Sequence, residues 1–124
     1  MTAYATANTA AYQQQAILTA TPGRLVVMLY DGALRFLFQS ATAMRQGLLA
    51  VADEKLRRAE AIVDELLVTL DMSQGEIAER LQAIYVFCNR LMREARTEHD
   101  AGKLDTTREL LAELREAWAE VAGA

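Results

Sequence analysis

Hydrophobic residues recur at helical spacing along most of the chain, in four blocks joined by short links that contain glycine or polar residues. Apolar positions that repeat about every 3.6 residues are typical of amphipathic α-helices. The pattern predicts helices at about 22–46, 52–71, 74–97 and 103–122. Four long helices with short connections favour an all-α fold, an antiparallel up-down four-helix bundle.

The residues at the ends of these blocks are those that helix termini prefer. Thr21 suits the N-cap of the first helix and Pro22 its first position, because the N–H that proline lacks has no partner there. Gly47 suits the end of this helix. Ser73 and Glu76 have the spacing of a capping box, in which each side chain accepts a hydrogen bond from the backbone N–H of the other residue. We therefore expect the third helix to begin at this pair.

Residues 1–11 lack helical periodicity and are rich in Ala, Thr and Asn. Terminal segments of this kind are poorly ordered unless something holds them. We expect a flexible N-terminal arm at 1–20, with a short helical turn or extended segment at 12–18. A single helical bundle domain at 21–124 follows it.

The first predicted helix carries more apolar surface than a bundle helix needs. In "LVVMLYDGALRFLF", residues 25–38, 11 of 14 residues are apolar, and they cover an arc of roughly 240°. Val27, Leu34 and Phe38 lie on the far side of this arc. Burying three such side chains stabilises by roughly 5–9 kcal/mol, comparable to the stability of a small domain. Either this helix is the most buried of the four, or the arm, a second copy of the chain or another partner covers the face. On the third helix, Val86 also falls outside the apolar arc.

Charge and composition exclude several classes of function. The formal net charge is −4 and the pI about 5.0, which argues against nucleic acid, because phosphate neutralisation dominates that affinity. No run approaches the ~20 apolar residues of a membrane span, so no membrane insertion is expected. The N-terminus lacks the basic and apolar regions of a secretory signal. The lone cysteine forms no internal disulfide, which fits a reducing compartment. A cytoplasmic protein is predicted.

Histidine and cysteine each occur once, as His99 and Cys88. Metal sites need clustered ligands, and the di-iron motif Glu-x-x-His fails because Arg96 lies three residues before His99. Cys88 lies on the apolar face of the third helix, where a free thiol is usually a core residue. The pattern therefore predicts no metal, no cofactor and no enzyme. It leaves one alternative, a signalling domain of the phosphotransfer or adaptor type, which requires His99 to be exposed within a helix.

One block of the sequence resembles a known family. "AYQQQAILTATPGRLVVMLYDGALRFL" is similar to the opening of the flagellar export chaperones of the FliS family, including Asp31-Gly32 after Met-Leu-Tyr. "KLRRAEAIVDELLVTLD" and "GEIAERLQAIYVFCNRLMREA" resemble the next two helices, with Tyr85 at the family's Leu-Tyr position. "LLAELREAWAEV" resembles the last helix of the family, with Trp118 in the family's Ala-Trp pair. The similarity runs in order through about residues 10–122.

The resemblance implies an antiparallel helical bundle with a chaperone function. It implies a cytosolic protein that binds the C-terminal segment of flagellin, prevents premature polymerisation and delivers flagellin to the flagellar type III export apparatus. In the family, the arm also contacts partners that include the export gate, and Tyr12 matches the arm tyrosine. Whether the chain without its partner forms a homodimer is an alternative that the sequence does not decide. The candidate partner-binding residues are Tyr12, Ile17, Leu18, Val27, Leu34, Phe38 and Val86.

Overall fold

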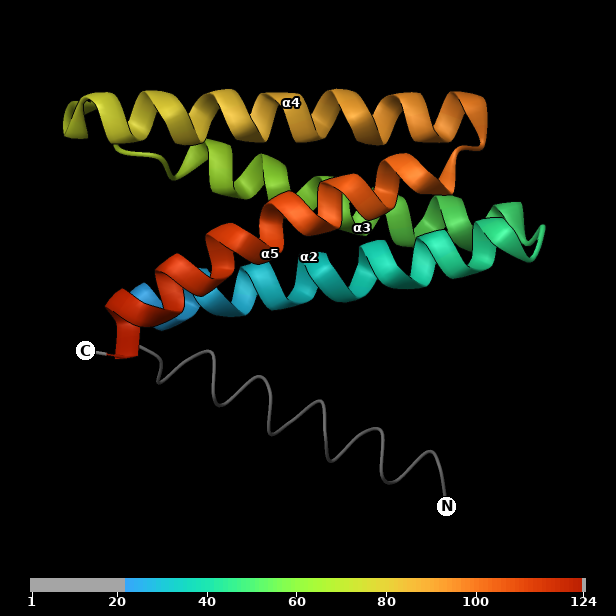
Figure 1. Cartoon of the computed structure of the whole chain (residues 1–124), viewed down its shortest axis with the longest axis horizontal. Coiled ribbons are helices and arrows are strands. Elements are labelled where there is room, and N and C mark those ends of the chain that lie inside the picture. Colours follow the sequence, from blue (N-terminus) through green and yellow to red (C-terminus); the bar gives the residue numbers. More distant parts are fainter. Residues whose placement is uncertain (1–21, 124) are drawn as a thin grey trace, which may run out of the picture.

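The computed structural model describes residues 22–123 as four long helices and one short turn of 3₁₀-helix (Figure 1). The predicted arm at 1–20 lies outside these residues, and so does Thr21. The elements are α2 (Pro22–Arg45), α3 (Leu49–Val68), η1 (Met72–Gln74), α4 (Glu76–Glu98) and α5 (Ala101–Gly123). Successive long helices run in opposite directions. The predicted all-α antiparallel bundle is therefore confirmed.

The four helices do not pack equally. The most extensive contacts are those of α2, with α3 on one side and α5 on the other, whereas α4 packs more sparsely against α3 and α5. In Figure 1, α4 and α2 lie on opposite edges of the molecule, with α3 and α5 between them. Because α2 has close neighbours on both flanks, much of its wide apolar arc serves packing inside the bundle.

One hydrophobic core connects all four helices. A Cβ atom added at Gly32 of α2 would lie 3.1 Å from Cδ1 of Ile62 of α3. Glycine is unfavourable inside a helix by about 1 kcal/mol relative to alanine, and at this position it leaves room for the tip of the Ile62 side chain. The largest fully buried apolar side chains are Tyr30, Tyr85, Leu37, Leu56, Met92, Leu104, Leu111 and Val63.

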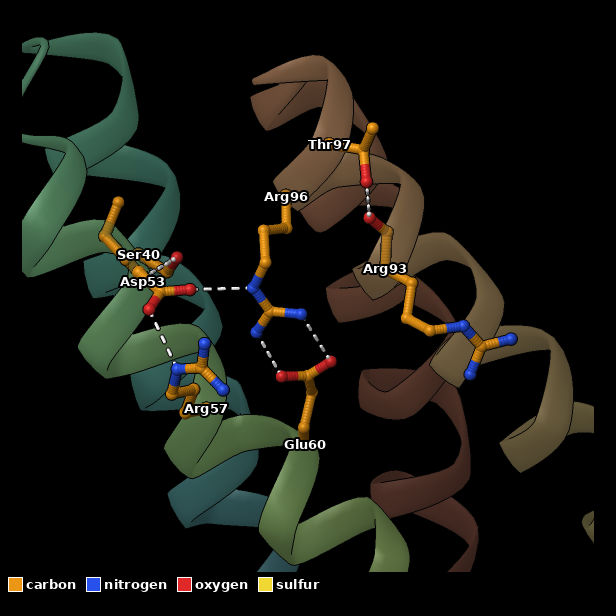
Figure 2. A network of polar contacts seen from close by, with 8 residues as sticks. Ser40, Asp53, Arg57, Glu60, Arg93, Arg96 and Thr97 are labelled. Atoms are coloured by element: carbon orange, nitrogen blue, oxygen red, sulfur yellow. Dashed lines mark hydrogen bonds and ion pairs between the residues drawn. The ribbon is translucent and has the colours of Figure 1, made fainter.

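A polar network fastens α4 to α3 (Figure 2). Arg96 of α4 points between two carboxylates of α3. Its Nε donates to Asp53 Oδ1 at 2.7 Å, and its two terminal nitrogens donate to the carboxylate of Glu60. Arg57 donates to the other oxygen of Asp53 at 2.8 Å. The hydrogen bonds from Arg96 and then from Arg57 hold the pKa of Asp53 below its usual range.

The predicted capping box at Ser73 and Glu76 is wrong. Asp71 caps the chain here, because its carboxylate accepts hydrogen bonds from the backbone N–H of Ser73, at 3.0 Å, and from the Ser73 hydroxyl. Ser73 therefore lies inside η1 and is not free to cap α4. The N-cap of α4 is Gly75, with φ of 74° and no side-chain cap hydrogen bond. Its left-handed conformation lets the chain turn once more before α4 begins.

Two other helix starts differ by a few residues from the predicted ones. The predicted start of α3 was residue 52, but this helix begins at Leu49, and α5 begins at 101 rather than 103. The extra turn of α3 leaves Leu48, Leu49 and Val51 exposed. Among the described helices, none has the length and apolar character needed to cross a membrane.

Candidate partner-binding surfaces

An open groove runs between α2 and α5. Leu34 of α2 lines it together with residues of α5, and its volume is about 510 Å³. Leu34 is half-buried. The apolar part of the groove lining comes from Leu34 and Ala112, and the remaining α5 residues carry charges of both signs. We call it the α2–α5 groove; its α5 residues are Asp105, Arg108, Glu109 and Ala112.

Phe38 lies one turn beyond Leu34 on α2, and 54% of its surface is exposed. The guanidinium of Arg108 covers part of its ring, which places Phe38 beside the α2–α5 groove. Val27 is half-buried and lies seven residues before Leu34, on the same flank of the helix. The structure thus brings Leu34 and Phe38 together at one partly exposed edge, with Val27 further along it.

Val86 lies apart from these residues. It is 54% exposed on α4. Three residues further along the same face of α4, Asn89 donates a hydrogen bond to Asp64 of α3 at 3.1 Å. Val86 therefore lies on the side of α4 that borders α3, whereas Leu34 and Phe38 border α5. The contacts of the described residues do not bring the three together. Tyr12, Ile17 and Leu18 lie outside the described residues.

A second cavity, which has a mainly apolar lining and which we call the end cleft, opens where α2 begins and α5 approaches its end. Its volume is about 240 Å³. Sequence reasoning missed it, because Val26, Tyr85 and Trp118 fall on ordinary core faces of three separate helices, and only their meeting at one end makes a cleft. Its apolar lining comes from Val26, Leu66, Leu70, Ile77, Ala78, Leu81, Tyr85 and Trp118.

The buried polar groups near the end cleft stay neutral. The hydroxyls of Tyr30 and Tyr85 form a hydrogen bond with each other inside the core, and the ring centroids lie 6.5 Å apart. Burial raises the pKa of both tyrosines. Burial also raises the pKa of the Cys88 thiol to about 11. A thiol with this pKa is protonated at neutral pH, and reactive cysteines have the opposite shift.

His99 occupies the C-cap of α4 in the left-handed conformation, with φ of 52°. His99 therefore follows the last residue of the helix. The phosphotransfer alternative required His99 to lie within the helix. Within residues 22–123, no three His, Cys, Asp or Glu side chains gather in a way that could hold a metal ion.

Together these features define a class of protein: an antiparallel helical bundle with an apolar cleft at one end and a partly exposed apolar edge along α2. Comparison with known sequences identifies one family. The model of the family described as "Flagellar protein FliS" matches residues 4–124. The chain therefore belongs to the FliS family, which confirms the resemblance seen in the sequence.

Individual relatives support the same family assignment. The flagellar secretion chaperone FliS of Bacillus subtilis is 34% identical over 108 residues, which cover 87% of this chain and 80% of that protein. The protein of the same name from Vibrio cholerae is 34% identical over 103 residues, with coverage of 82% and 76%. That of Salmonella typhimurium is 32% identical over 110 residues, with coverage of 87% and 82%. The relatives share most of the length of the chain, which supports an export chaperone role.

Proposed function

We propose that this protein is a non-enzymatic cytoplasmic chaperone that binds the C-terminal helical segment of flagellin. It prevents premature polymerisation and delivers flagellin to the flagellar type III export apparatus. One observation carries the proposal: in a member of a family of secretion chaperones, Leu34 and Phe38 form a partly exposed apolar edge along the α2–α5 groove.

The groove suits an amphipathic helix. Such a helix places its apolar residues on one stripe and its polar residues beside them, which suits a groove with a mixed lining. In the α2–α5 groove, Leu34 contacts the apolar stripe, while Arg108 and Glu109 meet polar groups of the partner. A segment that folds as it binds loses about 2–5 kcal/mol to ordering. Each apolar side chain that becomes fully buried returns about 1.5–3 kcal/mol. Several anchors are therefore needed, and Val27 and Phe38 extend the contact.

The N-terminal arm has a role in the same proposal. Leu18 lies four residues before Pro22, so an extended chain carries it at most about 14 Å from the start of α2. Val26, in the first turns of α2, lines the end cleft. We propose that Ile17 and Leu18 occupy the end cleft in the free protein. Tyr12 contacts the export gate, as the family resemblance implies for the arm.

Co-expression tests this function. The chain is produced with full-length flagellin, and in parallel with flagellin that lacks its C-terminal segment. We expect a complex that purifies as one species only with the full-length protein. Flagellin that co-purifies equally well without its C-terminal segment would contradict the proposed binding mode.

A further inference from the structure

Three cationic side chains surround one aromatic ring on the flank of α2 opposite the α2–α5 groove. The ring is that of Phe36, which is half-buried between α2 and α3. Its centroid lies 5.1 Å from Cζ of Arg35, 6.0 Å from Nζ of Lys55 and 5.7 Å from Cζ of Arg58. We call these four residues the Phe36 basic cluster. Because all three cations lie within 6.0 Å of the same ring centroid, positive charge is concentrated on this part of the surface.

This concentration of charge is unexpected in an acidic chain. The sequence has 17 acidic and 13 basic residues, so carboxylates are available to pair with every cation. Within residues 22–123, however, neither Arg35 nor Lys55 has an ion pair with a carboxylate. Arg58 meets only Glu54, at 3.3 Å, and both partners of that pair are more than half exposed. By contrast, Arg96 of the neighbouring network has two carboxylate partners.

The ring alone does not balance the three cations. A cation–π contact at an exposed site is worth about 0.5–1 kcal/mol. Like charges gathered around one ring repel one another, and salt screens that repulsion over a Debye length of about 8 Å. The cluster therefore gains if an anionic group from outside the chain approaches it. Its charge and its partly buried ring are complementary to a ligand that is both acidic and apolar.

Apolar side chains extend the cluster along α3. Val51 lies four residues before Lys55, and Ile62 lies four residues after Arg58, so all four share one stripe of the helix. Val51 is 43% exposed and Leu48, just before the helix, is 51% exposed. Apolar positions thus flank the two cations of α3 along an elongated strip, which matches the length of a helical segment better than that of a small anion.

We propose that this strip docks an acidic amphipathic helix of a second protein partner. Carboxylates one turn apart on that helix pair with Arg35, Lys55 and Arg58, and its apolar residues contact Phe36 and Val51. A net charge of −4 disfavours nucleic acid and anionic membranes, because their phosphates extend well beyond the cluster and meet the acidic remainder of the surface. The strip and the α2–α5 groove lie on opposite flanks of α2, so both partners bind at once.

The test uses the full chain and a designed probe. The probe is a fluorescein-labelled 18-residue amphipathic helix with leucines on one face and glutamates one turn apart beside them. A second peptide carries Gln at every Glu position. We expect saturable binding of the Glu peptide by fluorescence anisotropy, weakening as salt rises, and binding of the Gln peptide weaker by about tenfold. Equal binding of both peptides, or no saturable binding, overturns the proposal.

Matched variants locate the binding. The cluster variant is Arg35→Glu, Lys55→Glu, Arg58→Glu, and we expect it to weaken binding by about tenfold or more. The control, Arg80→Glu, Arg90→Glu, Arg93→Glu on α4, makes the same change in net charge and is expected to leave binding unchanged. Equal weakening by both variants means that only overall charge matters, which overturns the proposal.

Further variants and a membrane control distinguish binding at this strip from binding at the α2–α5 groove or to lipid. The milder pair Arg35→Gln, Lys55→Gln keeps the test valid if the triple variant fails to fold, and it too is expected to weaken binding. Phe38→Asp is expected to leave binding unchanged, and a loss shows that the probe occupies the α2–α5 groove instead. Tighter association with phosphatidylserine vesicles than with the Glu peptide assigns the strip to a membrane, and so also overturns the proposal.

Discussion

The guanidinium of Arg108 on α5 lies over the ring of Phe38 on α2, with Cζ 5.0 Å from the ring centroid. A contact of this kind is worth about 0.5–1 kcal/mol at an exposed site. Full burial of a phenylalanine against a partner is worth about 1.5–3 kcal/mol. Arg108 therefore covers the ring only weakly, and an apolar segment entering the α2–α5 groove gains more from Phe38 than the guanidinium loses.

The hydroxyl pair of Tyr30 and Tyr85 gives a first prediction, about stability. Either Tyr30→Phe or Tyr85→Phe leaves one buried hydroxyl without its partner, which we expect to cost about 1–3 kcal/mol in the free energy of unfolding. The double variant removes both hydroxyls and is expected to cost clearly less than the sum of the two single changes. Urea denaturation of the four proteins measures this coupling. Strictly additive losses would show that the two hydroxyls do not stabilise each other.

The close approach of Gly32 to Ile62 gives a second prediction. Gly32→Val places new methyl groups where a Cβ alone already lies 3.1 Å from Ile62. We expect the free energy of unfolding to fall by about 1–3 kcal/mol, as is usual for overpacked sites. In an Ile62→Ala background the same change should cost less, because the colliding atom is gone. An equal cost in both backgrounds would place the strain elsewhere.

The Arg96 network predicts a dependence of stability on pH. Its hydrogen bonds lower the pKa of Asp53 in the folded state, while the unfolded value is about 3.9. The stabilisation from this group is therefore fully present above the unfolded pKa and is lost as pH falls through the lower folded value. Asp53→Asn should be less stable at pH 7 and should show a shallower decline in acid.

Thermal unfolding between pH 7 and pH 3 measures this difference. Glu113→Gln, a change at an exposed carboxylate of α5, serves as the control and should follow the profile of the unchanged protein. An Asp53→Asn profile parallel to that of the unchanged protein at every pH would show that the network does not respond to acid.

The proposed place of the arm in the end cleft predicts a change in dye binding. Ile17→Asp with Leu18→Asp should free the apolar cleft, so that fluorescence of the dye 8-anilinonaphthalene-1-sulfonate rises on mixing with the folded chain. Thr6→Asp with Thr9→Asp adds the same charge earlier in the arm and should leave the fluorescence unchanged. A signal from the first pair no greater than that from the second would remove the arm from the cleft.

The sequence was sufficient to predict the bundle, because apolar spacing reports directly which face of each helix is buried. It could not predict which helices lie closest. The approach of Gly32 to Ile62, and the meeting of Val26, Tyr85 and Trp118 at the end cleft, depend on how separate helices cross. The start of α4 was misjudged because the Ser73 hydroxyl donates to Asp71 and does not cap α4, and spacing alone does not decide between these two arrangements.

The surplus of apolar residues on α2 has two structural explanations. Part of it is packing, because α3 and α5 both lie close to α2. The rest is the exposed edge at Leu34 and Phe38. Val86 shows the limit of the reasoning: it is as exposed as Phe38, but it lies on the α3 side of α4. Its part in binding stays a prediction, as do those of Tyr12, Ile17 and Leu18.

The central claim is that flagellin binds along the α2–α5 groove, and calorimetric titration of a flagellin C-terminal peptide into the full chain tests it most directly. Phe38→Asp is expected to weaken binding by about tenfold or more, as an anchor residue would, and Leu34→Asp should do the same. Val68→Asp puts the same charge on an apolar side chain that is 80% exposed at the end of α3, and should not change the affinity. If both groove variants retain their helical circular dichroism and bind the peptide as tightly as the unchanged protein, flagellin does not occupy this groove.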